Sequence, residues 1–336
     1  MVSIIVSAIK IIFLLGFLIG IHETGHFLVA KLCKVRVNEF AIGFGPTIWK
    51  KQGKETKYAI RLIPLGGFVS MEGEEEHSDK EGSFSKASIP KRIAIVMAGA
   101  TVNIVFALVV YFILSANSGS NVTTIINEIM PGYAAEQAGL QPGDEIVKIN
   151  NKKVKISTDV INIVTNSNGN ELTLEIKRKE NYENIVLSPT MGENSTYYLG
   201  VIFKKADNNF FNNIYYAFFD TGNFIVSIAD SVKQIFTGKL TTDQLMGPVG
   251  ISEVVTKTSG LTEFIYMLAL VSMSLGVTNL IPFPPLDGGK ILFLIIEGIR
   301  RKPLNEEIEV KIQLLGFAIL ITLSLYITYN DILRIF

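Results

Sequence analysis

The chain has 336 residues, of which 48% are hydrophobic, and its 31 basic and 31 acidic side chains give a formal net charge of zero. A protein without excess positive charge is not expected to bind nucleic acid. Cys33 is the only cysteine, which excludes an internal disulfide and leaves the compartment undefined by thiol content.

The apolar stretch from Ile4 to Leu32 is the first element, and it is long enough to cross a bilayer as one helix. No basic segment precedes it and no small-residue cleavage site follows it, so we expect a retained membrane span and not a signal peptide. Three further apolar regions bring the expected number of spans to four. The predicted spans are residues 1–32, 93–117, 261–300 and 308–336, and prolines break the third of them.

A metal-binding pattern lies late in the first span, where His22-Glu23-Thr24-Gly25-His26 reads H-E-x-x-H. Positions i and i+4 share one face of a helix, so His22 and His26 can bind the same metal ion. Glu23 would then lie beside the open coordination position, where a general base can take a proton from water. The alternative is two polar residues that solvate a helix end. It is disfavoured because ionisable groups inside a bilayer are costly and normally functional.

Residues 33–92 are expected to form a cytoplasmic or re-entrant region between the first two spans. Strand-like alternation over 33–70, with a turn at Gln52-Gly53-Lys54, predicts a β-hairpin. Two interpretations fit this spacing equally well. One is an ordinary cytoplasmic loop, and the other is a re-entrant hairpin whose exposed edge would pair with an unwound substrate strand. For the re-entrant hairpin, the candidate substrate-binding residues are Gly43, Phe44 and Gly45.

Residues 118–206 have the character of a soluble domain. A glycine-punctuated turn at 138–145 runs into an alternating strand at 146–150, and further strands are expected at 171–177 and 197–203, with a helix at 160–165. These elements predict a small extracytoplasmic α+β domain. It is either a generic domain of this kind or a PDZ fold, whose groove binds extended peptide ends.

The segment 207–260 is predicted to be an amphipathic linker that lies along the membrane interface. Its aromatic stretch, Phe210–Phe236, contains Asp220 and Asp230, which argue against a further span.

Catalytic zinc usually has three protein ligands, so a third ligand is needed beside the two histidines. Asp287 is the only aspartate deep within a predicted span, at a point where prolines and glycines break the helix, and is therefore the predicted third ligand. Asp287 could instead pair with Lys290 or cap the following helix segment, and Glu297 is the weaker candidate ligand. The remaining histidine, His77, lies in an acidic polar loop.

Two asparagines within predicted spans have less certain roles. Asn279 is a candidate substrate-binding residue, because in a broken helix its amide can hydrogen-bond a substrate backbone or a developing oxyanion. Simple packing between helices is the alternative for Asn279 and the favoured interpretation for Asn103.

Basic residues near the span ends predict the orientation of the chain in the membrane. The loops after the first and third spans are rich in lysine and arginine, including Lys31, Lys34, Arg36, Arg300 and Arg301, and should be cytoplasmic. Both termini and the central domain are then extracytoplasmic. The metal should lie within the membrane, nearer its cytoplasmic side.

With these motifs assembled, the chain resembles the bacterial site-2 protease family of intramembrane zinc metalloproteases, in the branch that carries one PDZ domain and regulates sigma-factor signalling. Ala100 departs from the family, which commonly has proline there. The matching stretches are His22–His26, 43–46, Arg61–Glu74, Lys91-Arg92 with 98–100 and Asn103, Gly247–Ile251, and Asn279–Gly289.

The resemblance implies a polytopic α-helical membrane protein of about four spans, with a re-entrant β-hairpin and an inserted PDZ domain, in the bacterial inner membrane. It implies a zinc metalloendopeptidase with Zn²⁺ as cofactor. Its expected substrates are transmembrane segments of single-pass proteins already trimmed by a site-1 protease, such as anti-sigma factors or signal-peptide remnants. The PDZ domain is expected to restrict the access of untrimmed substrates and to accept a peptide in its groove.

Two other functions are compatible with parts of the sequence. A membrane-anchored metalloprotease that cuts cytosolic loops would need the His22–His26 motif outside the bilayer. A non-catalytic PDZ scaffold would have no need of the intact histidine, glutamate and aspartate set.

Overall fold

The structure is a computed structural model that describes residues 2–74, 76, 78–119, 121–192, 195–237 and 247–335. His77 and residues 238–246 of the predicted linker lie outside the described residues. The chain forms two compact units. The first combines Met1–Val110 with Ile225–Phe336, and the second is Tyr111–Phe224.

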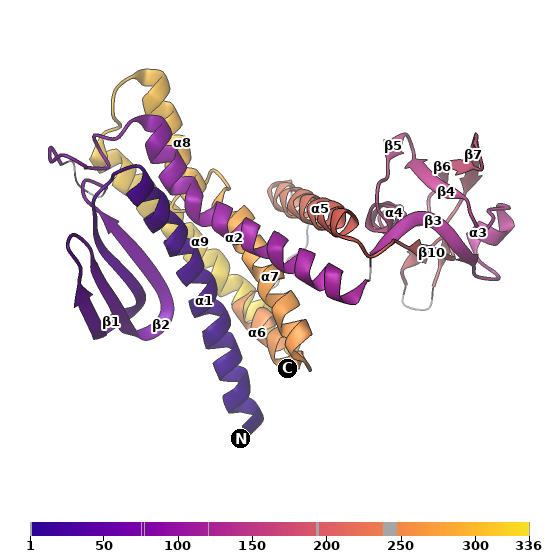
Figure 1. Ribbon diagram of the computed structural model, residues 1–336, viewed down its shortest axis with the longest axis horizontal. Coiled ribbons are helices and arrows are strands. Elements are labelled where there is room, and N and C mark those ends of the chain that lie inside the picture. Colours follow the sequence, from indigo (N-terminus) through magenta and orange to yellow (C-terminus); the bar gives the residue numbers. More distant parts are fainter. Residues whose placement is uncertain are drawn as a thin grey trace. The chain divides into compact units, whose positions relative to one another are not determined.

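Among the described residues, four helices are long and apolar enough to cross a membrane, as the sequence predicts. They are α1 (Val2–Leu32), α2 (Ile89–Ser118), α7 (Leu261–Asn279) and α9 (Glu306–Ile335) (Figure 1). The predicted break in the third span is also present. Helix α7 ends at Asn279, and α8 (Asp287–Arg300) begins after a segment that contains the three prolines of the predicted span, Pro282, Pro284 and Pro285.

Hydrogen bonds between helices show which helix ends lie together in the first unit. The Lys10 ammonium of α1 donates to the carbonyl oxygen of Thr258, just after α6 (Pro248–Lys257), at 2.9 Å. The Gly250 N–H of α6 donates to the Asp331 carboxylate of α9 at 2.7 Å. The start of α1, helix α6 and the end of α9 therefore share one side of the helical bundle. At the other side, Arg92 of α2 forms a bidentate ion pair with Glu297 of α8.

The predicted hairpin is present as β1 (Val37–Gln52) and β2 (Lys57–Met71), but it is not a simple two-stranded ribbon. Phe40 pairs with both Val69 and Tyr58, so the first half of β1 lies between the two ends of β2. The second half of β1 pairs with the first part of β2. Sharp bends make this doubling possible, and they fall at glycines with positive φ, which other residues adopt only with strain: Gly43, Gly45 and Gly66.

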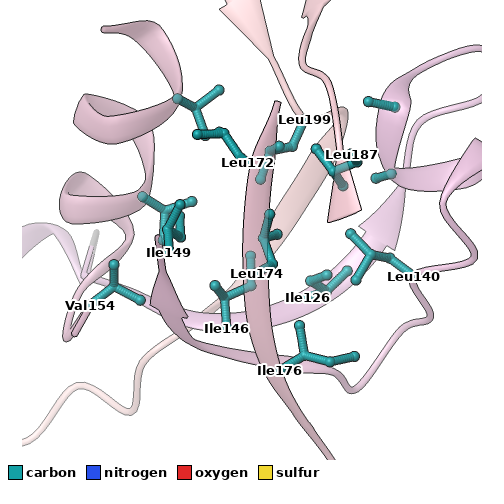
Figure 2. Close-up of a cluster of buried hydrophobic side chains, with 14 residues drawn as sticks. Ile126, Leu140, Ile146, Ile149, Val154, Leu172, Leu174, Ile176, Leu187 and Leu199 are labelled. Carbon is teal, nitrogen blue, oxygen red and sulfur yellow. The ribbon is translucent and has the colours of Figure 1, made fainter. Parts of the chain in front are cut away.

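The second unit contains the predicted α+β domain. Its six-stranded sheet has the order β10-β3-β4-β6-β7, with β5 beside β4. Figure 2 shows the apolar core of this domain, where fully buried Ile146, Leu174 and Ile176 project from neighbouring strands. The elements are β3 (Val122–Ile129), α3 (Ala134–Gln137), β4 (Glu145–Ile149), β5 (Lys152–Lys153), α4 (Ser157–Thr165), β6 (Leu172–Arg178), β7 (Asn181–Leu187), β8 (Thr190–Met191), β9 (Tyr197–Tyr198) and β10 (Val201–Lys205).

A buried ion pair holds the glycine-rich turn of this domain against its sheet. Asp144 accepts two hydrogen bonds from the Arg178 guanidinium, at 2.9 and 2.8 Å, and one from the Gln141 N–H at 2.8 Å. Burial alone would raise the pKa of Asp144, but these hydrogen bonds outweigh it and hold the pKa below its ordinary value of 3.8. The carboxylate therefore stabilises the domain fully above pH 3.8, and this contribution is lost as the pH falls through the lowered pKa.

Replacing Asp144 by asparagine is expected to destabilise this domain by about 1–3 kcal/mol at neutral pH, because Arg178 loses a charged acceptor. Hydrogen exchange of the β4 and β6 amides in the full-length protein measures the change. Glu183 is the matched control, since it binds the same guanidinium from an exposed position, and Glu183→Gln should cost at most about 1 kcal/mol. Equal effects of the two changes would contradict this account.

Candidate metal centre

Three predicted residues from opposite ends of the chain meet in the first unit. His22 and His26 lie one turn apart on α1, and Asp287 is the first residue of α8. The His22 Nε2 atom lies 3.2 Å from both His26 Nε2 and Asp287 Oδ2, and the His26 Nε2 atom lies 3.5 Å from Asp287 Oδ2. Within the described part of the chain, this is the group of side chains arranged to hold a metal ion.

The glycines after Asp287 allow α8 to begin directly against the proline-rich segment. A Cβ atom on Gly288 would lie 2.2 Å from the carbonyl oxygen of Ile281, and one on Gly289 would lie 2.6 Å from the Pro284 nitrogen. Any larger residue at either position would move the start of α8. The Asp287-Gly288-Gly289 sequence therefore places the carboxylate at the histidines because the following backbone can pack closely.

Helix α2 packs closely against α1 beside the metal centre. A Cβ atom on Gly25 of α1 would lie 2.5 Å from the carbonyl oxygen of Ala98, so the two helices are in backbone contact. A Cβ atom on Gly99 would lie 2.4 Å from His26 Nε2 and 2.8 Å from His22 Nε2. Glycine at position 99 thus keeps open the space in which the histidine nitrogens meet.

Hydrogen bonds from α2 orient both imidazole rings. The Ile95 carbonyl oxygen lies 2.8 Å from His26 Nδ1 and accepts its proton, so His26 Nε2 presents a lone pair to the cluster. The Asn103 side-chain nitrogen lies 3.2 Å from His22 Nδ1. The sequence favoured a packing role for Asn103. The residue is indeed fully buried, but it also contacts a histidine of the centre.

The donor set fits a zinc ion. Bonds of about 2.0–2.1 Å to the corners of a tetrahedron place the ligand atoms about 3.4 Å apart, close to the separations in this cluster. Asp287 Oδ2 is buried and forms no well-shaped hydrogen bond among the described residues, although both histidines are near it. A buried carboxylate oxygen in that state is unfavourable, and a cation bound between it and the two nitrogens would satisfy it.

The structure does not support the alternative roles of Asp287 as an ion-pair partner or helix cap, or Glu297 as the third ligand. Lys290 binds Glu74 at 2.6 Å and not Asp287. Leu286, and not Asp287, occupies the cap position of α8. Glu297 forms an ion pair with Arg92, near the start of α2.

A cavity of about 260 Å³ opens beside the cluster. Glu23 lines it together with the two histidines and Asp287. The Glu23 carboxylate forms no ion pair or hydrogen bond with another described residue, so it is available to accept a proton. Four lining residues belong to the Arg61–Glu74 motif, and Lys290 was considered only as a partner of Asp287. The sequence did not single out the lining residues Val96, Phe293 and Gln313.

The predicted substrate-binding residues are not among those that line this cavity. Asn279 is at the end of α7, and Gly43, Phe44 and Gly45 lie at the first bend of the sheet. The wall of the cavity comes instead from the last strand segment of β2, which contributes Phe68, Val69 and Met71. These residues belong to the Arg61–Glu74 motif, but only the pairing of β1 with both ends of β2 shows which part of the motif reaches the metal centre.

Comparison with known proteins identifies the family. The family model of peptidase family M50 matches residues 10–323. A protein of Clostridium acetobutylicum, named provisionally as a zinc metalloprotease, is 34% identical over 321 residues, which are 94% of each chain. The zinc metalloprotease RasP of Geobacillus kaustophilus is 28% identical over 100% of both chains.

Two further similarities are to a relative over nearly the whole chain and to a solved structure over a quarter of it. The regulator of sigma-W protease RasP of Bacillus subtilis is 28% identical over 98% of this chain and 99% of its own. The solved PDZ domain of an SdrC-like protein from Listeria monocytogenes covers 25% of this chain and 87% of its own, at 19% identity and a TM-score of 0.22. Because the family model spans nearly the whole sequence, the chain belongs to peptidase family M50, a family of zinc-dependent metalloproteases.

Proposed function

We propose that this protein is an intramembrane protease that cleaves transmembrane segments of single-pass membrane proteins during regulated intramembrane proteolysis. One observation carries the proposal. The paired histidines lie inside a helix whose membrane-length portion runs from Ile5 to Leu32, and the cavity beside them is lined by residues of α1, α2, α8, α9 and the end of β2. A protease built to cut soluble loops would have no reason to place its site there.

His22, His26 and Asp287 would hold the zinc ion, and Glu23 would act as general acid and base. When bound, zinc supplies a Lewis acid that polarises the scissile carbonyl and makes water easier to deprotonate. Glu23 takes a proton from the attacking water and later delivers it to the leaving amine. The Ile95 carbonyl keeps His26 in the tautomer that presents Nε2.

The last segment of β2 is the proposed docking strand for the substrate. Residues 67–71 pair on one side with the first half of β1, and their other side has no strand partner among the described residues. This edge borders the cavity that contains Glu23. An unwound substrate could add to it as a further strand, which would hold its backbone extended beside the metal centre. Gly43, Phe44, Gly45 and Asn279 remain proposed substrate contacts outside the cavity wall.

The β1–β2 sheet is proposed to enter the membrane from the cytoplasmic side. A Cβ on Gly16 would lie 2.9 Å from the Pro64 carbonyl oxygen, so the tip of the sheet reaches the middle of α1. Large apolar side chains near this tip are exposed and would contact lipid: Phe44, Ile48, Trp49, Ile60, Leu62 and Ile63. Lipid or a substrate helix is the environment that such a surface fits.

The proposed location is the bacterial inner membrane, with both termini and the central domain outside the cytoplasm. The contacts among α1, α6 and α9 agree with this topology. They bring together the start of α1 and the end of α9, and the basic loops predict that both of these ends are extracytoplasmic. Helix α5 (Phe210–Phe236) exposes Phe210, Phe211 and Phe218 and is proposed to lie along the outer interface.

The central domain is proposed to act as a PDZ module that screens substrates. A groove of about 600 Å³ runs between α4 and the segment 197–201, and its lining is mostly apolar. Val160 and Val164 face it from the helix, and Leu199 and Gly200 from the opposite side. Such a groove can take the extended end of a peptide, as would be created when another protease trims the substrate. Trimmed anti-sigma factors and signal-peptide remnants are the proposed partners.

The test is a proteomic comparison of membrane fragments that accumulate in cells with the wild-type protein and with Glu23→Gln. We expect single-pass proteins, trimmed on their outer side, to accumulate only with the variant. Single-cysteine labelling at positions flanking His22 adds an independent measurement, with the native Cys33 replaced by serine. Free aqueous labelling all around the helix, or accumulation of soluble proteins only, would favour the anchored protease that cuts cytosolic loops.

A further inference from the structure

We propose that Asn103 is a positioning residue of the metal centre, whose amide holds the His22 ring in either of its two tautomers. Asn103 is 0% exposed, and its side-chain nitrogen lies 3.2 Å from His22 Nδ1. Its side-chain oxygen is also buried and has no hydrogen-bond partner among the described residues. The inference rests on the proposed zinc site, and it concerns a residue that is neither a ligand of the metal nor the proposed base.

The tautomer of His22 depends on whether its Nε2 atom carries a proton or binds a metal ion. When Nε2 carries the proton it can donate toward Asp287 Oδ2, which lies 3.2 Å away, and Nδ1 must then accept from the Asn103 amide nitrogen. The structure places the amide nitrogen of Asn103, and not its oxygen, at His22 Nδ1, which is the contact that this tautomer needs. When Nε2 binds a metal it has no proton, so Nδ1 carries the proton and needs an acceptor.

Rotation of the Asn103 amide by half a turn supplies that acceptor. The rotation exchanges the amide nitrogen with the unpaired oxygen, and the oxygen can accept the Nδ1–H of His22. In either orientation one amide atom contacts His22 and the other is unpaired, so the exchange does not change the number of hydrogen bonds made. A carboxylate could serve only the metal-bound tautomer, and an apolar side chain could serve neither.

The position of Asn103 is fixed from the other side by α7. The Ser272 hydroxyl donates to the backbone carbonyl of Asn103 at 3.0 Å, and a Cβ on Gly276 would lie 3.3 Å from the Asn103 Cβ. The backbone is therefore held independently of the side-chain amide. A residue that served packing alone would have no need of an amide here, because a buried polar group without full pairing is unfavourable.

The experiment measures the zinc affinity of the purified full-length protein in detergent, by competition with a chromophoric chelator. Asn103→Leu is expected to weaken zinc binding by about 10–100-fold, the usual effect of losing a group that orients a ligand. Asn103→Asp should bind at least as tightly as the wild type, since its carboxylate accepts the Nδ1–H. Thr101→Val is the matched control, because Thr101 is an exposed residue of the same helix whose hydroxyl donates to the Met97 carbonyl, and the change should leave the affinity unchanged.

The order of affinities separates positioning from packing. Positioning predicts Asp at least equal to Asn and both above Leu, whereas packing predicts Leu at least equal to Asn and both above Asp. The packing order, or equal affinities for all three, would overturn the proposal. If Asn103→Leu does not fold, Asn103→Ala replaces it in the same comparison. A wild-type protein that binds no zinc would instead refute the proposed function itself.

Discussion

Replacing Glu23 by glutamine is expected to reduce peptide-bond cleavage by about a thousandfold, while the zinc affinity stays within a few-fold of the wild type. Glutamine has nearly the same size and cannot accept the proton of the attacking water. The cavity position of Glu23 and the absence of an ion pair to another described residue both favour the role of a base. Turnover of a co-purified single-pass membrane protein measures the activity, and metal analysis measures the retained zinc.

The matched control is Glu55→Gln, the same chemical change at a residue that binds Lys31 and does not line the cavity of the metal centre. Its activity should equal that of the wild type. If Glu23→Gln kept full activity, Glu23 would not be the base, and a scaffold role or a contaminating protease would have to be considered. If it lost zinc together with activity, Glu23 would act on the metal and not on the proton.

The local parts of the metal centre could be predicted because their pattern is set by the helix. His22 and His26 share a face at any point in a helix, so the spacing alone brings their rings together. Asp287 could be chosen because carboxylates are rare within spans and this one follows a proline-rich break. The four spans were equally predictable, since about twenty apolar residues in a row have few other uses.

The long-range parts of the structure could not be read in this way. The first half of β1 pairs with both ends of β2, and this pairing depends on bends at Gly43, Gly45 and Gly66. Alternation of apolar and polar residues along a strand does not reveal a bend. The sequence did not predict strand β7, because its first residues, Asn181 to Asn184, are all exposed and show no alternation of buried and exposed positions. Lys290 and Glu74 meet across more than 200 positions of sequence, and no local pattern connects them.

The role of Asn103 shows the same limit at a single residue. An asparagine within an apolar span indicates a buried hydrogen bond, but the sequence does not say to which partner. The register of α2 against α1 decides this, and it depends on the backbone contact between Gly25 and Ala98. The same register places Gly99 beside the histidine nitrogens. One helix contact thus determines both the space in the metal centre and the orientation of His22.

Replacing Asp287 by asparagine is expected to weaken zinc binding by about a hundredfold or more, because a ligand is lost and not only a group that orients one. The amide has nearly the shape of the carboxylate, so α8 should still begin at position 287 and the fold should be kept. Metal content after mild chelation, together with the circular dichroism spectrum, measures the two effects separately.

Glu297→Gln is the control that distinguishes the ligand from its rival. Glu297 is engaged by Arg92, so its loss should destabilise the packing of α2 on α8 without releasing zinc. The opposite result, with zinc lost from Glu297→Gln and retained by Asp287→Asn, would mean that the helix break does not supply the third ligand. The short separations between Asp287 Oδ2 and both histidines argue for the first result, because no other described carboxylate joins these nitrogens in a group that could hold a metal.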